Sequence, residues 1–175
     1  MTIAALIALA TKQLRNAGVA NPDLDARALI AHALGVDRLS LALHGQNNLS
    51  ADQKDQVAEL VKRRAGREPL AHIVGARGFW LLDLKVTPAV LDPRPDSETL
   101  IEQCLKRLAD RNRTYRIADL GTGSGALLLA LLSEYPRAQG IGVDLSNSAL
   151  AIAKQNAAQN GLAGRSVLFR RRHGN

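Results

Sequence analysis

The sequence has very little cysteine and no long apolar run. Its one cysteine, Cys104, has no partner for an internal disulfide or a metal site, so no oxidising compartment is indicated. No stretch approaches the roughly 18 to 20 apolar residues of a membrane span, and no basic segment precedes the apolar start at Ile3, as a signal peptide would require. Hydrophobic residues still make up 46% of the 175 residues, enough for a core. We therefore expect a globular, cytoplasmic protein.

A broad basic region is also missing. The net charge is +7 at pH 7. Residues 1–75 hold nine basic and seven acidic residues, residues 76–168 hold eleven and nine, and the other three basic residues are Arg170, Arg171 and Arg172. Proteins that bind nucleic acid gather basic residues on one face. We therefore expect no direct nucleic-acid binding and no membrane contact, and we expect a monomer.

The first 70 residues have the pattern of a small helical bundle. Thr2 and Asn21 each precede an apolar helical stripe as candidate caps, and proline follows Asn21 at the first helical position. Ser50 and Gln53 form a capping box at the start of another helix. This part contains no nucleophile, metal cluster or phosphate loop. We expect residues 1–70 to form a helical domain that packs against or recognises a partner.

Residues 71–95 have the pattern of a β-hairpin followed by a proline-rich connector. Apolar and β-branched residues occur at Ile73–Val74, at 79–82 and at 84–87, with glycines between the first two segments. Prolines then prevent a helix as far as Pro95. We expect this segment to join two structural units.

Residues 96–175 have the pattern of a partial α/β domain. Asp96 or Ser97 can cap a first helix. The expected strands are 115–119, 140–144 and 167–169, and the expected helices between them are 124–134 and 147–160. Strands that alternate with helices favour parallel pairing in a doubly wound sheet. The predicted fold class is α/β, with an incomplete doubly wound, Rossmann-like sheet after a small helical bundle and a β-hairpin.

A glycine-rich loop joins the first of these strands to its helix. The segment is Asp119-Leu120-Gly121-Thr122-Gly123-Ser124-Gly125. Glycine lets the backbone turn tightly and approach a ligand, and a helix amino end presents unpaired N–H groups. The pattern therefore predicts a site for a nucleotide-like ligand. The loop alone does not identify that ligand, because Gly121, Gly123 and Ala126 also fit the dinucleotide pattern.

Two acidic residues narrow the choice of ligand. A pyrophosphate would bring negative charge toward Asp119, whereas S-adenosylmethionine has an ammonium and a sulfonium group and no phosphate. Asp144 ends the next strand, about 20 residues after the glycine loop, which is the separation expected of a carboxylate that binds a ribose hydroxyl. Both ligands contain ribose, so Asp144 is compatible with either. We expect S-adenosylmethionine, with a nicotinamide cofactor as the weaker alternative. The expected cofactor-binding residues are Asp119, Gly121, Thr122, Gly123, Ser124, Gly125 and Asp144.

Four short segments precede the glycine loop in a fixed order. They are Glu68-Pro69-Leu70, Gly78-Phe79-Trp80, Val86-Thr87-Pro88 and Pro93-Arg94-Pro95-Asp96-Ser97-Glu98. In this order they resemble the release-factor glutamine methyltransferases of the HemK/PrmC type, over residues 1 to about 167. Ser97 stands where that family more often has threonine.

The resemblance implies a class I methyltransferase fold and a specific reaction. The family transfers a methyl group from S-adenosylmethionine to the side-chain amide nitrogen of the glutamine in the Gly-Gly-Gln motif of peptide release factors. A close relative modifies a ribosomal protein instead. In the family, an Asn-Pro-Pro-Tyr loop holds the amide in line with the donor methyl group, which is catalysis by positioning.

That catalytic loop has no counterpart in these residues. No two of the six prolines are adjacent. From Tyr115 to Asn175, both ends counted, there are 61 residues, too few for a complete doubly wound domain. We therefore expect a chain truncated before the loop, inactive by itself, with no catalytic residue and no metal site. The alternative function is a noncatalytic fragment that binds the donor or a partner.

Three aromatic or basic side chains carry no assigned role. Phe79 and Trp80 either line a substrate entrance or pack the hairpin against the sheet. His173 stands beside three arginines near the end of the sequence, where we expect a solvated tail rather than a catalytic base.

Overall fold

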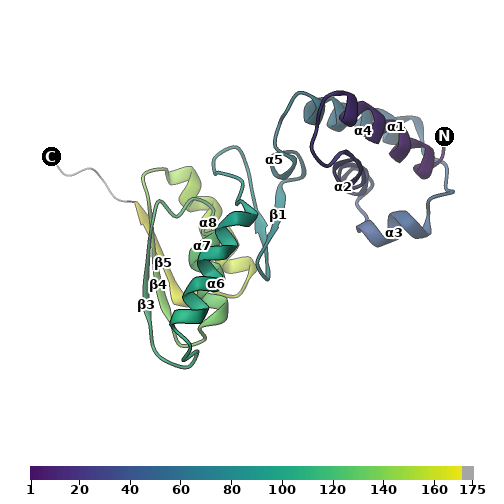
Figure 1. Ribbon diagram of the computed structural model, residues 1–175. Helices are drawn as coiled ribbons and strands as arrows, with labels where there is room; N and C mark the ends of the chain where they lie inside the picture. Colours follow the sequence, from purple (N-terminus) through teal and green to yellow (C-terminus); the bar gives the residue numbers. More distant parts are fainter. Residues whose placement is uncertain (171–175) are drawn as a thin grey trace. The chain divides into compact units, whose positions relative to one another are not determined.

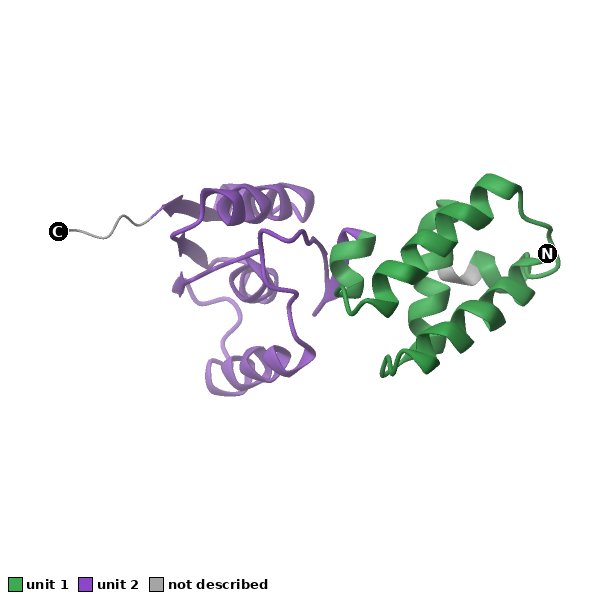
Figure 2. Ribbon diagram, turned by 90° about the horizontal axis from the view of Figure 1, so that it is seen from above, with its two compact units in different colours: residues 1–74 green, residues 75–175 purple. Residues whose placement is uncertain are grey.

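The computed structural model describes residues 1–170, apart from the side chains of residues 38 and 39. It divides the chain into two compact units, Met1–Val74 and Gly75–Asn175 (Figure 2). No helix within the described residues is long and apolar enough to cross a membrane. His173 and its expected solvated tail lie outside the described residues.

The first unit is entirely helical. Its helices are α1 (Ile3–Asn16), α2 (Pro22–Leu34), α3 (Arg38–Leu43), α4 (Ala51–Ala65) and α5 (Leu70–Val74). The Thr2 hydroxyl accepts a hydrogen bond from the backbone N–H of Ala5, and the capping box of Ser50 and Gln53 is formed in both directions. Asn21 is the N-cap residue of α2, as expected, although its side chain makes no capping hydrogen bond. Proline at the first position of α2 still suits the helical backbone.

Apolar faces of α1, α2 and α4 form the core of the first unit. Fully buried members include Leu14, Leu29 and Val57. One carboxylate, that of Asp25, is buried with them and accepts a hydrogen bond from Arg64 Nε at 2.7 Å. Because a buried charge is costly unless it is paired, this ion pair allows α2 and α4 to pack closely.

The second unit begins with an antiparallel hairpin of β1 (Ala76–Phe79) and β2 (Leu82–Lys85). The expected strand at Ile73–Val74 was wrong. Both residues belong to α5, where the Ile73 N–H bonds to the carbonyl of Pro69 and the Ile73 side chain joins the core of the first unit. Burial in a helical core therefore outweighs the β propensity of these two residues.

After the hairpin, strands and helices alternate as expected. The elements are a 3-10 turn η1 (Pro95–Ser97), α6 (Glu98–Arg107), β3 (Arg116–Leu120), α7 (Ala126–Glu134), β4 (Gln139–Asp144), α8 (Asn147–Gln159), a 3-10 turn η2 (Ala163–Arg165) and β5 (Ser166–Arg170). The three strands are parallel in the order β3-β4-β5. The α/β class and the parallel sheet are confirmed, although the Ser97 side chain makes no capping hydrogen bond.

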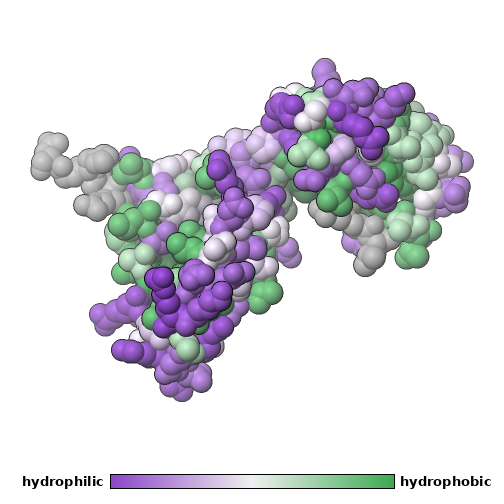
Figure 3. Space-filling model, in the orientation of Figure 1, coloured by the Kyte–Doolittle hydropathy of each residue, from purple (hydrophilic) through white to green (hydrophobic). Residues whose placement is uncertain are grey.

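Both crossover helices, α7 and α8, lie on one side of this sheet (Figure 1). Right-handed crossovers between strands in sequential order place their helices on the same face. Apolar side chains are exposed on the sheet strands: Leu120 (73% exposed), Ile141 (44%), Val167 (60%) and Phe169 (47%). Hydrophobic residues accordingly appear among hydrophilic ones on the surface of this unit (Figure 3).

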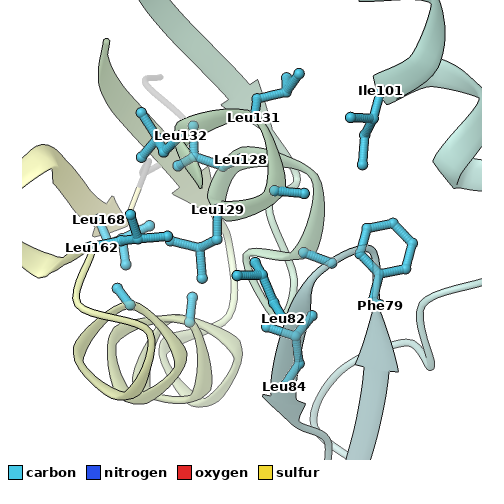
Figure 4. Packing of buried hydrophobic residues seen from close by; sticks show 14 of the residues in the cluster. Phe79, Leu82, Leu84, Ile101, Leu128, Leu129, Leu131, Leu132, Leu162 and Leu168 are labelled. Carbon is cyan, nitrogen blue, oxygen red and sulfur yellow. The ribbon is translucent and has the colours of Figure 1, made fainter. Parts of the chain in front are cut away.

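The core of the second unit lies between the sheet, α8 and the hairpin. Leucines of α7 fill its centre, and Phe79, Leu82 and Leu84 of the hairpin pack into the same cluster (Figure 4). Residues 71–95, expected as a connector, are thus divided between α5 in the first unit and the hairpin in the second.

Candidate cofactor site

The glycine-rich loop leaves β3 and enters α7 through three left-handed backbone positions. Gly121, Gly123 and Gly125 have φ angles of 80°, 55° and 82°, which glycine adopts without steric cost. The N–H groups of Gly121 and Thr122 both donate to the carbonyl of Val143, at 2.8 and 3.0 Å. The loop is therefore held against the end of β4.

Two further backbone N–H groups and one hydroxyl of the loop also form hydrogen bonds within the protein. The Gly123 N–H donates to Asp144 Oδ2 at 2.9 Å, and the Gly125 N–H donates to the carbonyl of Thr122 at 2.8 Å. The Thr122 hydroxyl donates to Asp119 Oδ2 at 2.8 Å. Four backbone N–H groups of the loop thus bond to the protein itself. A phosphate would have to compete with these bonds and would meet two carboxylates.

Asp144 lies where β4 ends, beside a small cavity. Its Oδ1 accepts from the Ser146 N–H at 2.9 Å and its Oδ2 from Gly123. A carboxylate has about four acceptor positions, so acceptor capacity remains on both oxygens. The cavity has a volume of about 240 Å³ and is lined by Leu120, Gly121, Val143, Asp144 and Leu145.

A larger cleft of about 360 Å³ also opens at the loop. One wall is formed by the loop and by the start of α7. The opposite wall consists of Phe79, Leu91, Pro93, Arg94 and Ser97. Gly121 lines both the cleft and the small cavity. The two hollows therefore offer an elongated ligand two neighbouring compartments, with a carboxylate in each.

The structure brings most of the expected cofactor-binding residues to these two hollows. Asp119, Gly121, Thr122, Gly123 and Ser124 line the cleft, and Asp144 lines the small cavity.

Gly125 lines neither hollow. A Cβ atom there would lie 3.1 Å from Leu129 Cδ1 and 3.4 Å from Ala153 Cβ, so this glycine lets α7 and α8 pack closely. Its left-handed φ also places it at the start of α7.

The opposite wall of the cleft could not be predicted from the sequence. Leu91, Pro93 and Arg94 lie in the segment expected as a connector, and no local pattern shows that it faces the glycine loop. The one relevant observation was the family resemblance of residues 93–98.

Phe79 and Trp80 serve mainly to pack the hairpin. Phe79 is almost fully buried in the core and is also one of the residues that line the cleft. The Trp80 N–H donates to Glu98 Oε1 at 2.8 Å, and its indole N–H donates to Glu134 Oε1 at 2.7 Å. These bonds hold the hairpin turn against α6 and α7, and so fix the wall that Phe79 contributes.

Potential metal ligands do not cluster among the residues that the structure describes. Among residues 1–170, no group of three or more His, Cys, Asp or Glu residues is arranged to hold a metal ion. The charged residues that line the two hollows are Asp119, Asp144 and Arg94.

Comparison with known proteins identifies both units. Residues 5–75 match the model of the PrmC N-terminal domain, and residues 111–172 match that of a methyltransferase domain. The glycine loop and Asp144 both fall within the second match. This agrees with a site built for a methyl donor.

Several bacterial relatives of this chain carry the name release factor glutamine methyltransferase. The protein of Caulobacter vibrioides is 41% identical over 160 residues, which is 91% of this chain and 55% of that protein. The protein of Xylella fastidiosa strain Temecula1 is 45% identical over 166 residues, 95% of this chain and 57% of that protein. The chain thus spans little more than half the length of the curated relatives it matches.

Part of this chain is also similar to solved structures of methyltransferases. A SAM-dependent methyltransferase from Geobacter sulfurreducens in complex with S-adenosyl-L-homocysteine is 28% identical and covers 45% of this chain and 29% of that chain, with a TM-score of 0.37. The assignment rests on sequence. The resemblance seen in the sequence is confirmed: the chain contains segments that match a PrmC N-terminal domain and a methyltransferase domain, and it is similar to the release factor glutamine methyltransferases, a family that uses S-adenosylmethionine.

Proposed function

We propose that this chain is part of an enzyme that methylates a glutamine of a release factor, and that its α/β unit binds the methyl donor. The observation that carries the proposal is the pair of hollows that meet at Gly121. Asp119 offers a carboxylate to the cationic, amino-acid end of S-adenosylmethionine. Asp144 offers its remaining acceptor capacity to the ribose hydroxyls.

The same geometry disfavours a nicotinamide cofactor. Dinucleotide sites bind a pyrophosphate with unpaired N–H groups of the loop. Here the N–H groups of Gly121, Thr122 and Gly123 already donate to Val143 and Asp144. A positively charged ligand avoids this competition and is attracted by both carboxylates.

We further propose that the helical unit recognises the release factor. Support comes from its match to the PrmC N-terminal domain and from the name of the relatives. The glutamine would be that of the Gly-Gly-Gln motif, modified in the cytoplasm as part of translation termination.

Residues 1–175 by themselves are proposed to bind the donor without transferring its methyl group. They contain no Asn-Pro-Pro-Tyr segment. Positioning of reactants can supply about 7 to 11 kcal/mol of a barrier. Loss of that contribution lowers a rate by several powers of ten, which makes a noncatalytic fragment the second candidate function.

Transfer of radiolabelled methyl groups to a purified release factor tests both statements. The chain is compared with a chimera in which it continues into the remaining sequence of the Caulobacter vibrioides relative. We expect label only from the chimera, and only on a release factor that retains the Gly-Gly-Gln glutamine. A chimera that binds donor but labels no glutamine would contradict the substrate assignment. Equal labelling by both proteins would show that catalysis needs no additional loop.

A further inference from the structure

Basic side chains gather at the end of the α/β unit that is opposite to the glycine loop. The loop and Asp144 lie at the carboxyl ends of β3 and β4, and the amino ends of these parallel strands meet at the other end of the sheet. Residues 106–116, which lead from α6 into β3, and residues 134–137, which lead from α7 toward β4, contain six basic and two acidic residues. Hydrophilic side chains cover this lower end of the unit in Figure 3. The six basic residues, here named the arginine patch, are Lys106, Arg107, Arg111, Arg113, Arg116 and Arg137.

Contacts between the two segments hold the patch together. Arg116 is the register partner of Gln139 in the sheet, and the Gln139 N–H donates to the carbonyl of Tyr115 at 3.0 Å. Arg137 stands two residues before Gln139. The rings of Tyr115 and Tyr135 meet edge to face, with 5.1 Å between their centroids. Strand pairing and this ring contact thus bring together basic residues that are far apart in the sequence.

The acidic residues of these segments neutralise little of the positive charge. Glu134 forms an ion pair with Arg111. The Asp110 carboxylate accepts the backbone N–H of Asn112 at 3.0 Å. The carboxyl ends of α6 and α7 also attract cations, but a helix end is equivalent to only about half an elementary charge. The other five basic side chains of the patch are exposed and form no ion pair with the described residues.

The aromatic residues of the patch decide which kind of anion it suits. Sites for single-stranded nucleic acid combine basic groups with free aromatic faces on which bases stack. Here the guanidinium groups of Arg111 and Arg113 lie 5.6 and 5.7 Å from the ring centroids of Tyr135 and Tyr115, over the rings. Tyr135 is also buried. The patch therefore offers little surface for stacking, whereas its guanidinium groups can bind carboxylates through paired hydrogen bonds.

We infer that the arginine patch binds an acidic surface of a partner protein, and that this partner is the release factor. The identity of the partner rests on the proposed function. Because the patch and the glycine loop are at opposite ends of the sheet, a protein bound to the patch leaves the cleft open to the donor. Complementary charges across an interface speed association and fix orientation. The patch thus adds to the recognition proposed for the helical unit.

Fluorescence anisotropy of a labelled, purified bacterial release factor, titrated with the whole chain, tests the inference. The test variant is Arg116→Glu/Arg137→Glu. The matched control, Lys85→Glu/Lys154→Glu, makes the same change of net charge at two exposed lysines of β2 and α8, outside the patch. A parallel titration uses a labelled single-stranded RNA. Circular dichroism checks that both variants remain folded.

We expect the test variant to bind the release factor at least about tenfold more weakly than the unaltered chain, and the control to bind within about twofold of it. The difference should shrink between about 0.1 and 1 M salt, where the screening length falls from about 10 to 3 Å. Equal weakening by both variants, or none by the test variant, would overturn the inference. So would loss of RNA binding by the test variant while release-factor binding stays unchanged. If the unaltered chain bound no release factor, the recognition proposed for the helical unit would fail too.

Discussion

At the scale of single residues, Gly142 connects the packing of the sheet to the site. It lies in β4, next to the glycine loop. A Cβ atom at this position would be 2.5 Å from Leu168 Cδ2 and 3.0 Å from Thr122 Oγ1. The side chains of Leu168 and Thr122 would therefore both have to shift. Because the Thr122 hydroxyl bonds to Asp119, a side chain at position 142 would disturb the wall of the cleft.

We therefore expect Gly142→Ala to lower the free energy of unfolding by about 1 to 3 kcal/mol, the usual cost of overpacking a core. Urea denaturation measures this change. Gly164→Ala is the matched control, because a Cβ atom there meets no heavy atom within 4 Å, and its effect should stay within about 0.5 kcal/mol. Equal stability of the two variants would contradict the packing described for β4.

Tyr135 gives the α/β unit a dependence on alkaline pH. Its ring is 1% exposed, and its hydroxyl donates to the carbonyls of Cys104 and Leu108 at 3.2 and 3.0 Å. Burial raises the pKa of the Tyr135 phenol above its ordinary value. The folded state thus favours the protonated phenol. The associated stability is complete below about pH 10, the ordinary pKa, and is lost as the pH rises through the raised pKa of the folded protein.

We expect the urea midpoint of the unaltered chain to fall more between pH 8 and pH 10.5 than that of Tyr135→Phe. The phenylalanine variant lacks the ionisable hydroxyl but keeps the ring in the core. It should be less stable at pH 8, because the two carbonyls lose their donor. Identical losses over this pH range would show that Tyr135 does not titrate with folding.

At the scale of elements, Asn156 of α8 joins the hairpin to the glycine loop. Its side chain is fully buried. Its Oδ1 accepts from the Lys85 N–H at 2.7 Å, and its Nδ2 donates to the carbonyls of Lys85 and Ser124 at 3.1 and 2.8 Å. One amide thus satisfies three backbone groups that belong to β2 and to the loop. Of the residues bonded to Asn156, Ser124 lines the cleft.

Asn156→Leu should lower the free energy of unfolding by at least about 2 kcal/mol, because each buried polar group left without a partner costs about 1 to 3 kcal/mol. Gln155→Ala changes an exposed residue of the same helix and should have little effect. Chemical denaturation of both variants measures their free energies of unfolding. If Asn156→Leu were as stable as Gln155→Ala, the bonds between α8, β2 and the loop would not be important to the fold.

Much of the element structure could be predicted from local sequence. The capping box at Ser50, the helices α7 and α8 and the strand β4 agree with the structure to within about two residues. Ile73–Val74 could not be assigned correctly, since these β-branched residues favour a strand and a run of two apolar residues is too short to show a helical periodicity. Its state is decided by packing in the helical core, which local pattern does not contain.

At the scale of the whole molecule, long-range contacts explain what the sequence did not reveal. The hairpin joins the α/β unit through bonds from Trp80 to Glu134 and from Lys85 to Asn156, over 54 and 71 residues. Asp119 and Asp144 could be placed beside the glycine loop from the sequence, because a strand-loop-helix motif fixes their spacing. Arg94 could not, because its place in the cleft depends on how the segment before α6 folds back toward the loop.

The measurement that tests the central claim most directly is calorimetric titration of residues 1–175 with S-adenosylhomocysteine and with NAD. We expect weak but measurable binding of S-adenosylhomocysteine, since both hollows that meet at Gly121 lie within this chain. Asp144→Ala should abolish that binding, whereas Asp83→Ala, which removes an exposed carboxylate of the hairpin, should leave it unchanged. Equal or tighter binding of NAD would contradict the account.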